Sequence, residues 1–525
     1  MNKYYLFIVL ILFTSCKKEP IIDLENFQIS KSSDKEGEII DIDTILLSPF
    51  KSRSLLAFYN SRDNKTVWQS ENNRKTILET IKNCEAEGLN PADYNISKLL
   101  ELEKKFTDLD EAGLINYDLL LTYNLQKYLI HLHNGKLDPK VLYSNWDLTR
   151  EELDTKSVLN NALEKDSLSS EIQKCQPKAL TYHKLIKALT LIDKFPEDKT
   201  APVITDQKIE PNTESPAIIA IKKKLLYWKD LESTDSITSK YDKEMAKAVK
   251  KFQKRHGLIA DGIIGKSTIT ALNFTKEDRK HQIIVNLERW RWFAKSFATN
   301  YLLINIPDYS LNVVEDQNIT MTKRIVVGTI KRKTPVLTSI LQTIVFNPTW
   351  TVPPTILQED IIPELTKNRN FLKNKGIGIY DSKNNEVDPQ NWNEKKPNGY
   401  RYIQKPGYNN SLGVVKINFP NKRSVYLHDT NHRNYFERHN RSLSSGCVRV
   451  EKPLELVELL LDNPKRYSKE KMDSIVATRK TLFIGIKKRY AIYQWYWTAW
   501  CEDNELIFRN DIYNLDSDLY AQLRN

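Results

Sequence analysis

The hydrophobic period of the chain changes near Tyr301, and this change sets the fold class. Before it, apolar residues recur three and four positions apart, as in residues 117–132, which is the spacing of an amphipathic helix. After it, apolar and polar residues alternate, as in residues 301–307 and 322–327, which predicts strands. We therefore predict a multidomain α+β protein, in which helical domains precede a mostly β domain.

Glycine, proline and polar clusters divide the chain further. We predict a helical domain over residues 51–195, interpreted as a structural scaffold, then a proline- and acid-rich linker over residues 196–215. A compact three-helix module is predicted over residues 216–275. The β domain is predicted over residues 280–525, with its clearest helix over residues 453–461. Its polar insert, residues 354–401, is typical of a lid or of a disordered segment.

The N-terminus has the pattern of a secretory signal. Lys3 precedes an apolar run over residues 4–13 that is far too short to span a bilayer. Ser15 and Cys16 follow, and a small residue before a cysteine resembles a bacterial lipobox, in which the cysteine is acylated. A plain secretory signal, cleaved elsewhere, is the alternative.

We therefore expect residues 1–16 to be a lipoprotein signal peptide and residues 17–50 to be a polar tether. Cys16 would then carry the lipid that anchors the protein to a membrane, inner or outer. The expected location is the cell envelope, on the periplasmic side.

Charge and cysteine content limit the classes of partner and cofactor that the protein could bind. The formal net charge is +12, which favours an anionic partner. The sequence has no paired zinc ligands and no glycine-interrupted aromatic strand, so we expect an anionic polymer rather than a nucleic acid. The cysteines show no CxxC spacing, and we predict neither a metal nor another cofactor. Cys84 and Cys175 could pair in an oxidising compartment, but nothing in the sequence requires it.

The strongest chemical signal is a glycine–cysteine pair downstream of a histidine. Cys447 would be a weak nucleophile on its own, and an imidazole such as His428 can take its proton. Gly446 lets a substrate approach closely, and the N–H groups of Gly446 and Cys447 could stabilise an oxyanion. Arg449 lies two residues on, so in a strand it would share the face of Cys447.

Each of these residues also has a structural interpretation. A lone cysteine is usually a small buried apolar residue, and a lone histidine usually serves as a hydrogen-bonded structural residue. For Arg449 the alternative is a salt bridge with Glu451 or Glu455. The combination of these residues in one stretch favours the chemical interpretation for Cys447 and His428.

The stretch from His428 to Val450 resembles the catalytic motif of the YkuD family, H-x-T followed by S-x-G-C-x-R. Residues 286–292, 347–353 and 406–409 are similar to the large, YcbB-like branch of that family. Residues 252–268 resemble the three-helix peptidoglycan-binding module. The resemblance covers nearly all of residues 50–525.

This resemblance implies an L,D-transpeptidase that acts on peptidoglycan stem peptides. Cys447 would attack the third stem residue, release the terminal D-alanine and form a thioester, and a second stem would then give a 3→3 cross-link. His428 corresponds to the base, which in the family is oriented by a backbone carbonyl that the sequence does not place. Tyr426 and Ser445 are expected to border the substrate, and residues 354–401 occupy the place of the family's capping subdomain.

Other functions stay open. An L,D-carboxypeptidase would use the same acyl-enzyme with water as the acceptor, and a wall-binding anchor would have an idle centre. A papain-like protease fits less well, because such enzymes place the cysteine before the histidine. The three-helix module could likewise serve only as a spacer.

Overall fold

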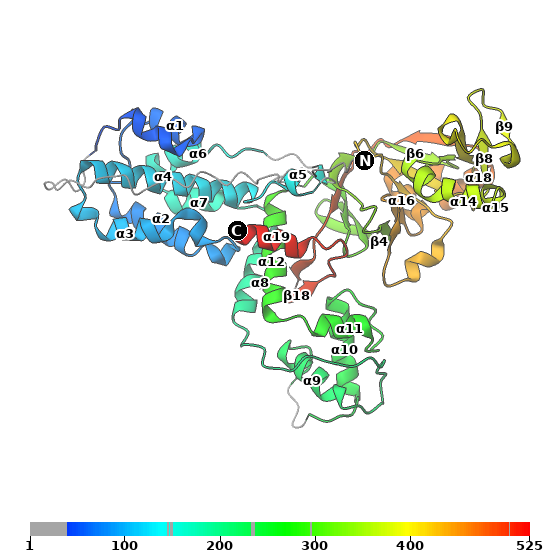
Figure 1. The fold of residues 1–525 in the computed structure, drawn as a ribbon, viewed down its shortest axis with the longest axis horizontal. Helices are drawn as coiled ribbons and strands as arrows, with labels where there is room; N and C mark the ends of the chain where they lie inside the picture. The colour runs from blue at the N-terminus through cyan, green and yellow to red at the C-terminus, as the bar shows by residue number, and fades with distance from the viewer. Residues whose placement is uncertain (1–38, 144–145, 148–150, 233–236, 294–296, 503) are drawn as a thin grey trace, which may run out of the picture. The chain divides into compact units, whose positions relative to one another are not determined.

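The computed structural model describes residues 39–143, 146–147, 151–232, 237–293, 297–502 and 504–525, and these fall into two compact units (Figure 1). The first unit holds residues 39–83, 91–130 and 153–175, and the second holds the other described residues. Among the described residues, no helix combines the length and the apolar character that a bilayer-spanning segment needs. Cys16 and the predicted signal peptide lie outside the described residues.

The first unit is helical, as the periodicity predicts. Ser52, Ser70 and Asp154 each accept a backbone N–H from the first turn of the helix that follows, which favours helix initiation at these points. The helices are α1 (Arg53–Asn60), α2 (Glu71–Lys82), α3 (Ile96–Lys104), α4 (Glu111–Asn134), α6 (Thr155–Glu164) and α7 (Leu168–Lys174). Their apolar faces form a buried core that includes Leu55, Ile77 and Leu121.

The predicted tether extends too far towards the C-terminus, because residues 39–50 pack on this helical unit. Ile40 and Phe50 are buried. The Ile40 N–H donates to the Thr66 hydroxyl at 2.9 Å, and the Thr66 N–H donates to the Ile40 carbonyl at 2.9 Å. The apolar residues of this segment are too sparse to show a helical or strand period, but Ile40 and Phe50 are nevertheless buried in the core.

The three-helix module is present in the second unit, as predicted. Its helices are α9 (Ala217–Tyr227), α10 (Lys243–Arg255) and α11 (Lys266–Leu272). The Gln253 side-chain amide accepts from the Gly262 N–H at 2.9 Å and donates to the Ile263 carbonyl at 2.8 Å. Gly262 has φ +82°, a left-handed conformation that favours glycine. One side chain therefore fixes the glycine-rich turn that leads into α11.

Part of the predicted linker also belongs to this module. Val203 and Ile209 are buried, and Ile209 forms an isolated β-bridge with Ile264. The Val203 N–H donates to Asn273 at 2.8 Å. A segment rich in proline and acidic residues lacks periodicity, but single apolar side chains are enough to dock it on a neighbouring core.

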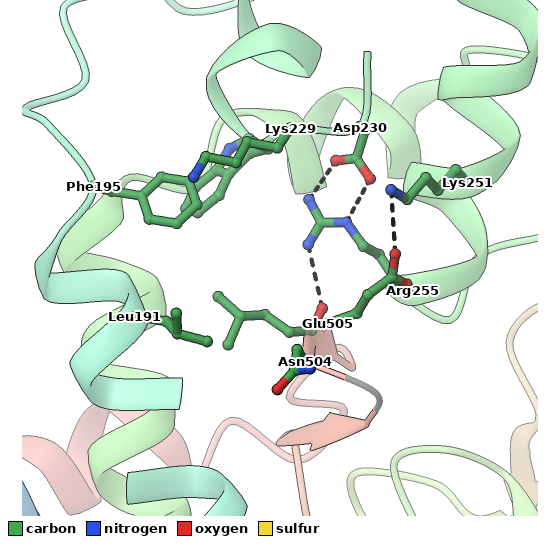
Figure 2. Close-up of a pocket in the computed structure, with 10 residues that line it drawn as sticks. Leu191, Phe195, Lys229, Asp230, Lys251, Arg255, Asn504 and Glu505 are labelled. Atoms are coloured by element: carbon green, nitrogen blue, oxygen red, sulfur yellow. Dashed lines mark hydrogen bonds and ion pairs between the residues drawn. The ribbon is translucent and has the colours of Figure 1, made fainter. Parts of the chain in front are cut away.

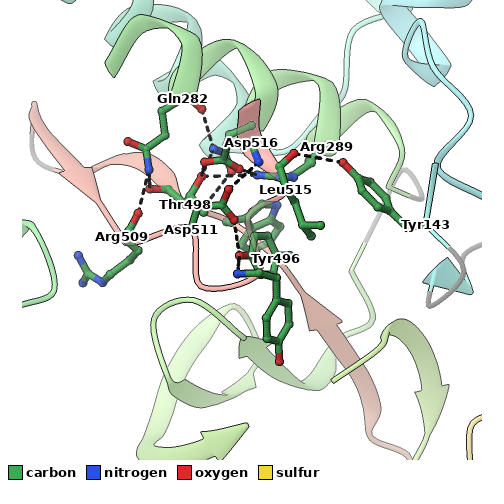
Figure 3. Close-up of polar contacts among 12 residues, drawn as sticks. Tyr143, Gln282, Arg289, Tyr496, Thr498, Arg509, Asp511, Leu515 and Asp516 are labelled. Atoms are coloured by element: carbon green, nitrogen blue, oxygen red, sulfur yellow. Dashed lines mark hydrogen bonds and ion pairs between the residues drawn. The ribbon is translucent and has the colours of Figure 1, made fainter. Parts of the chain in front are cut away.

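The helix α12 (Lys276–Arg291) leads from the module into the β domain. It packs beside α8 (Leu180–Asp193) and the C-terminal helix α19 (Asp516–Arg524) (Figure 1). Figure 3 shows the polar contacts between α12 and the start of α19: Arg289 pairs with Asp516 at 2.6 Å, and the Thr498 hydroxyl donates to Asp516 at 2.7 Å. The end of the chain is thus fixed to the entry helix of the β domain.

A sheet of twelve strands in the described residues forms the centre of the β domain. Its strands run in the order β1 (Trp146–Asp147), β5 (Val336–Ile340), β16 (Ala491–Trp495), β2 (Asn300–Asn305), β3 (Ser310–Glu315), β4 (Asn318–Gly328), β14 (Val448–Val450), β12 (Leu427–His428), β11 (Val415–Asn418), β6 (Thr343–Phe346) and β15 (Leu482–Gly485), and β13 (Ser442–Ser444) also pairs with β4. Helix α16 (Pro453–Leu461) matches its predicted bounds, whereas α18 (Lys469–Ala477) and the strands β5 and β15 were not predicted.

The polar insert is an ordered subdomain with its own core, rather than an irregular segment. Its strands pair in the order β7 (Trp350–Thr351), β10 (Arg401–Gln404), β8 (Ile377–Tyr380) and β9 (Glu386–Val387). The helical segments that precede β8 are α13 (Pro354–Ile356), the π-helical turn η5 (Leu357–Ile361), α14 (Ile362–Lys367) and α15 (Phe371–Asn374). The buried core includes Leu365, Leu372 and Trp392.

The hairpin of β17 (Ala499–Glu502) and β18 (Glu505–Phe508) contacts the three-helix module around a small cavity of about 190 Å³ (Figure 2). Arg255 of α10 pairs with Asp230 at 2.7 Å and also donates to the Leu506 carbonyl at 3.3 Å. Lys251 pairs with Glu505 at 3.2 Å. These contacts join the module to the β domain.

Candidate active site

The predicted site residues meet in one cavity of about 780 Å³ in the β domain. It is lined by side chains from the sheet, from the loop before β5 and from the insert. The lining includes Tyr426, His428, Ser445, Gly446, Cys447 and Arg449, so of the predicted site residues only Cys16 lies elsewhere, outside the described residues. Long-range pairing has therefore brought the two halves of the motif together.

Strand register explains this meeting. β12 lies between β11 and β14, with His428 opposite Lys416 on one side and opposite Arg449 on the other. The Val448 N–H donates to the Tyr426 carbonyl at 3.2 Å, which places Cys447 beside Tyr426. Because alternate side chains in a strand share a face, Cys447 and Arg449 lie on the same side of the sheet as His428.

The orienting carbonyl that the sequence could not place belongs to Asp429. The His428 Nδ1 hydrogen-bonds to this carbonyl oxygen, so Nδ1 carries the proton and Nε2 keeps its lone pair. Asp429 is itself fixed, because its carboxylate accepts the Val414 N–H at 2.9 Å and pairs with Arg433 at 2.7 Å. Burial lowers the pKa of His428 to about 3, and the cation of Arg449 contributes to this shift. The imidazole is therefore neutral at neutral pH and can act as a base.

The thiol of Cys447 is held in its protonated form. Burial raises its pKa, and hydrogen bonding from Tyr426 together with the charges of Lys416 and Arg449 only partly opposes this effect. Since burial disfavours the charged form of both partners, the resting pair is a neutral thiol and a neutral imidazole.

Gly446 is held by two hydroxyl groups. Its N–H donates to the Ser444 hydroxyl at 3.1 Å, and its carbonyl accepts from the Thr334 hydroxyl at 2.9 Å. The predicted use of the Gly446 N–H for an oxyanion is therefore not supported, because this donor already has an acceptor. In the described part of the chain the Cys447 N–H donates to no protein group. Gly446 has φ +113°, which accounts for glycine before the cysteine.

Arg449 has no acidic partner among the described residues. Glu451 and Glu455, the acids that the salt-bridge alternative requires, pair instead with basic residues of β4. The Arg449 Nη1 donates to the Thr430 hydroxyl at 3.3 Å, and its buried Nε lacks an acceptor. The guanidinium is thus placed beside the thiol with hydrogen-bonding capacity left for a ligand.

Four basic residues of this site were missed in the sequence, and two of them, Lys416 and Arg332, have informative contacts. Lys416 lies opposite His428, and its Nζ is 3.9 Å from the centroid of the Tyr426 ring. A signal for it existed, because Lys416 alternates with the buried Val415 and Ile417 and so occupies the other face of the strand. Arg332, in contrast, lies in a loop and had no such signal.

Arg332 connects the insert to the loop that carries the cysteine. Its guanidinium pairs with Glu359 and Asp360 of η5, each at 2.6 Å, and donates to the Ser445 hydroxyl at 3.0 Å. Ser445 is therefore a neighbour of the insert as well as of Cys447. Within the described ranges, no group of three or more His, Cys, Asp or Glu side chains is placed to hold a metal ion.

Comparison with known protein families matches three parts of the chain. The models are "Scaffold domain" for residues 53–189, "Putative peptidoglycan binding domain" for residues 214–272 and the YkuD "L,D-transpeptidase catalytic domain" for residues 299–466. Residues 299–466 therefore resemble a YkuD catalytic domain in sequence. The chain thus carries, in this order, regions that match a scaffold domain, a peptidoglycan-binding domain and an L,D-transpeptidase catalytic domain.

A curated relative from Haemophilus influenzae, named "Putative L,D-transpeptidase", is 35% identical over 220 residues. The match covers 41% of this chain and 45% of the relative. Among solved structures, an L,D-transpeptidase from Stackebrandtia nassauensis matches 55% of this chain and 96% of its own at 16% identity and a TM-score of 0.23. One from Xylanimonas cellulosilytica matches 55% and 99% at 14% identity and a TM-score of 0.18.

Proposed function

We propose that this protein is a peptidoglycan L,D-transpeptidase that forms 3→3 cross-links through a thioester on Cys447. The observation that carries the proposal is that Cys447 lines the same cavity as a neutral His428 whose Nδ1 is held by the Asp429 carbonyl. This is the arrangement that nucleophilic catalysis requires: a nucleophile, a base and a group that orients the base. It lies within the residues that match the YkuD catalytic domain.

The first half-reaction forms the thioester. The His428 Nε2 takes the thiol proton as the Cys447 Sγ attacks the carbonyl carbon of the third stem residue. The Cys447 N–H is the backbone donor available for the oxyanion. When the tetrahedral intermediate collapses, the bond to D-alanine breaks and the imidazolium gives its proton to the leaving amine. The products are free D-alanine, a neutral imidazole and the acyl-enzyme.

The second half-reaction transfers the acyl group. An amine from the side chain of another stem attacks the thioester and loses a proton to His428. The carbon–sulfur bond then breaks, and the imidazolium returns this proton to the Cys447 thiolate. In the carboxypeptidase alternative water replaces the amine, and the same residues act in the same order.

Arg449 is proposed to hold a substrate carboxylate near the scissile bond. Its guanidinium can form two parallel hydrogen bonds with a carboxylate, and no protein carboxylate among the described residues competes for it. Tyr426 and Ser445 line the same cavity and would border the bound stem.

The test is incubation of the full chain, purified in detergent, with a disaccharide-tetrapeptide, followed by mass analysis of the products. Cross-linked dimers with loss of D-alanine support the proposal, tripeptide monomers point to the carboxypeptidase, and unchanged substrate points to a wall-binding anchor. Cys447→Ala should abolish both the products and the acyl-enzyme. The matched control is Cys501→Ala, which removes another buried thiol of the β domain and should leave the reaction intact.

The proposed location is the periplasmic side of the cell envelope, through a lipid on Cys16. The support is the lipobox-like sequence together with domains that act on and bind peptidoglycan. Cys16→Ser should release the protein from the membrane fraction. A variant that stays in the membrane fraction would show that another feature anchors the chain.

A further inference from the structure

The lining of the 780 Å³ cavity contains basic side chains and no acidic ones. The basic residues are Arg332, Lys333, Lys416, Arg423 and Arg449. Arg332 is neutralised by the two acids of η5. A cavity with this excess of positive charge concentrates anionic ligands, because like charges along low-dielectric walls add to one another.

Lys416 is one of the basic residues of this lining that the proposed mechanism does not use. It is half-buried on β11, and within the described residues it has neither an ion pair nor a hydrogen-bond acceptor. Its contact is with the face of the Tyr426 ring, at 3.9 Å from Nζ to the ring centroid. A partly buried ammonium is costly to leave uncompensated, so a nearby anion is expected when the site is filled.

The position of Lys416 is fixed by strand register. Lys416, His428 and Arg449 lie side by side across β11, β12 and β14. Neighbouring strands are about 4.8 Å apart, so the backbones that carry the two cations are separated by roughly 10 Å, with the base between them. The reacting bond lies next to His428, and one cation is therefore available on each side of it.

We propose that Lys416 is a specificity-determining residue that binds a second carboxylate of the donor stem, on the opposite side of His428 from Arg449. This inference rests on the proposed function. One carboxylate belongs to the terminal residue that leaves, and the other belongs to the side chain of the third residue. The favoured donor is then a stem whose third residue is a diamino acid with a free side-chain carboxyl, and a stem with a carboxamide there is a poor donor.

The experiment compares two tetrapeptides that differ only at this position, one with the free carboxyl and one with the carboxamide. The rate of acyl-enzyme formation on Cys447 is measured by intact mass for the full chain in detergent. The wild type should acylate about tenfold faster or more with the carboxyl peptide, the factor that corresponds to about 1.4 kcal/mol. Lys416→Met should lose this preference by slowing on the carboxyl peptide alone, and Lys416→Arg should keep most of it.

The matched control is Lys422→Met, which removes an exposed cation that is near in sequence but does not line the cavity. It should keep the wild-type preference and thereby exclude a general charge effect. Equal rates of the wild type on the two peptides would overturn the proposal while leaving the function intact. Equal slowing of Lys416→Met on both would overturn it in favour of a role in stabilising the thiolate. Failure of the wild type to acylate with either peptide would instead refute the proposed function.

Discussion

Thr334→Val tests how the cysteine loop is held in place. The Thr334 hydroxyl accepts the Gly328 N–H at 2.8 Å and donates to the Gly446 carbonyl at 2.9 Å. Thr334 is fully buried, and both glycines are buried as well. Valine has nearly the same shape, so the substitution removes the hydrogen bonds and leaves the volume almost unchanged.

The magnitude follows from the two groups that lose their partner. A buried donor or acceptor without a partner costs about 1–3 kcal/mol, so two of them cost about 2–6 kcal/mol. This cost is a large fraction of the stability of a typical domain, which is about 5–15 kcal/mol. Because Gly446 directly precedes Cys447, the same loss of positioning should slow acylation of the thiol.

The assay is urea denaturation followed by the fluorescence of the tryptophans in the β domain, together with the rate of acyl-enzyme formation. The midpoint should fall with an unchanged slope, which identifies a change in stability and not in compactness. Thr322→Val is the control, because its exposed hydroxyl donates to the Asn312 side chain at 2.7 Å, and it should change stability by less than about 0.5 kcal/mol. A Thr334→Val midpoint and acylation rate equal to the wild type would refute the role assigned to this hydroxyl.

Three further predictions concern charge. Arg449→Lys should lose about 1.5–3 kcal/mol of transition-state binding, which is the value for hydrogen bonds to charged groups. The measurement is kcat/KM on tetrapeptide stems. Normal kinetics with a lowered melting temperature would instead give Arg449 a purely structural role. Alkylation of Cys447 by iodoacetamide should accelerate with pH through and beyond neutrality, because its pKa is raised and His428 stays neutral above about pH 3; a plateau near pH 7 would show a preformed thiolate. Asp230→Ala should destabilise the contact between the three-helix module and the β17–β18 hairpin by about 3–5 kcal/mol, because it leaves Arg255 buried without its carboxylate partner. The measurement is amide hydrogen exchange in α10, which should become faster; unchanged exchange would show that the pair contributes nothing.

Much of the fold could be predicted from sequence, because secondary structure depends on local periodicity. The change of period at Tyr301 separates the helical regions from the β domain, and α16 begins and ends at the predicted residues. The motif around Cys447 and His428 likewise consists of short stretches whose residue types are visible directly. Gly446 was singled out in the sequence because it allows close approach of a substrate; the structure adds that its backbone conformation, φ +113°, is one that glycine adopts at little cost.

What the sequence could not supply are contacts between residues distant in the chain. Residues 39–50 and the segment around Ile209 have too few apolar residues to show a period, and they pack only because a core formed elsewhere accepts single side chains. The ordered structure of the insert could not be predicted either, because its strands are short and its buried residues are scattered through polar sequence.

The site shows the same division at the level of single atoms. The sequence by itself indicated which residues are candidates for a nucleophile, a base and a substrate-binding cation. The tertiary structure alone decided that the Asp429 carbonyl holds His428, that the Ser444 hydroxyl accepts the Gly446 N–H and that Lys416 lines the cavity with no ion pair to the described residues. The physical reason is that strand register is set by the burial of a whole sheet face at once, so no local pattern specifies which groups become neighbours.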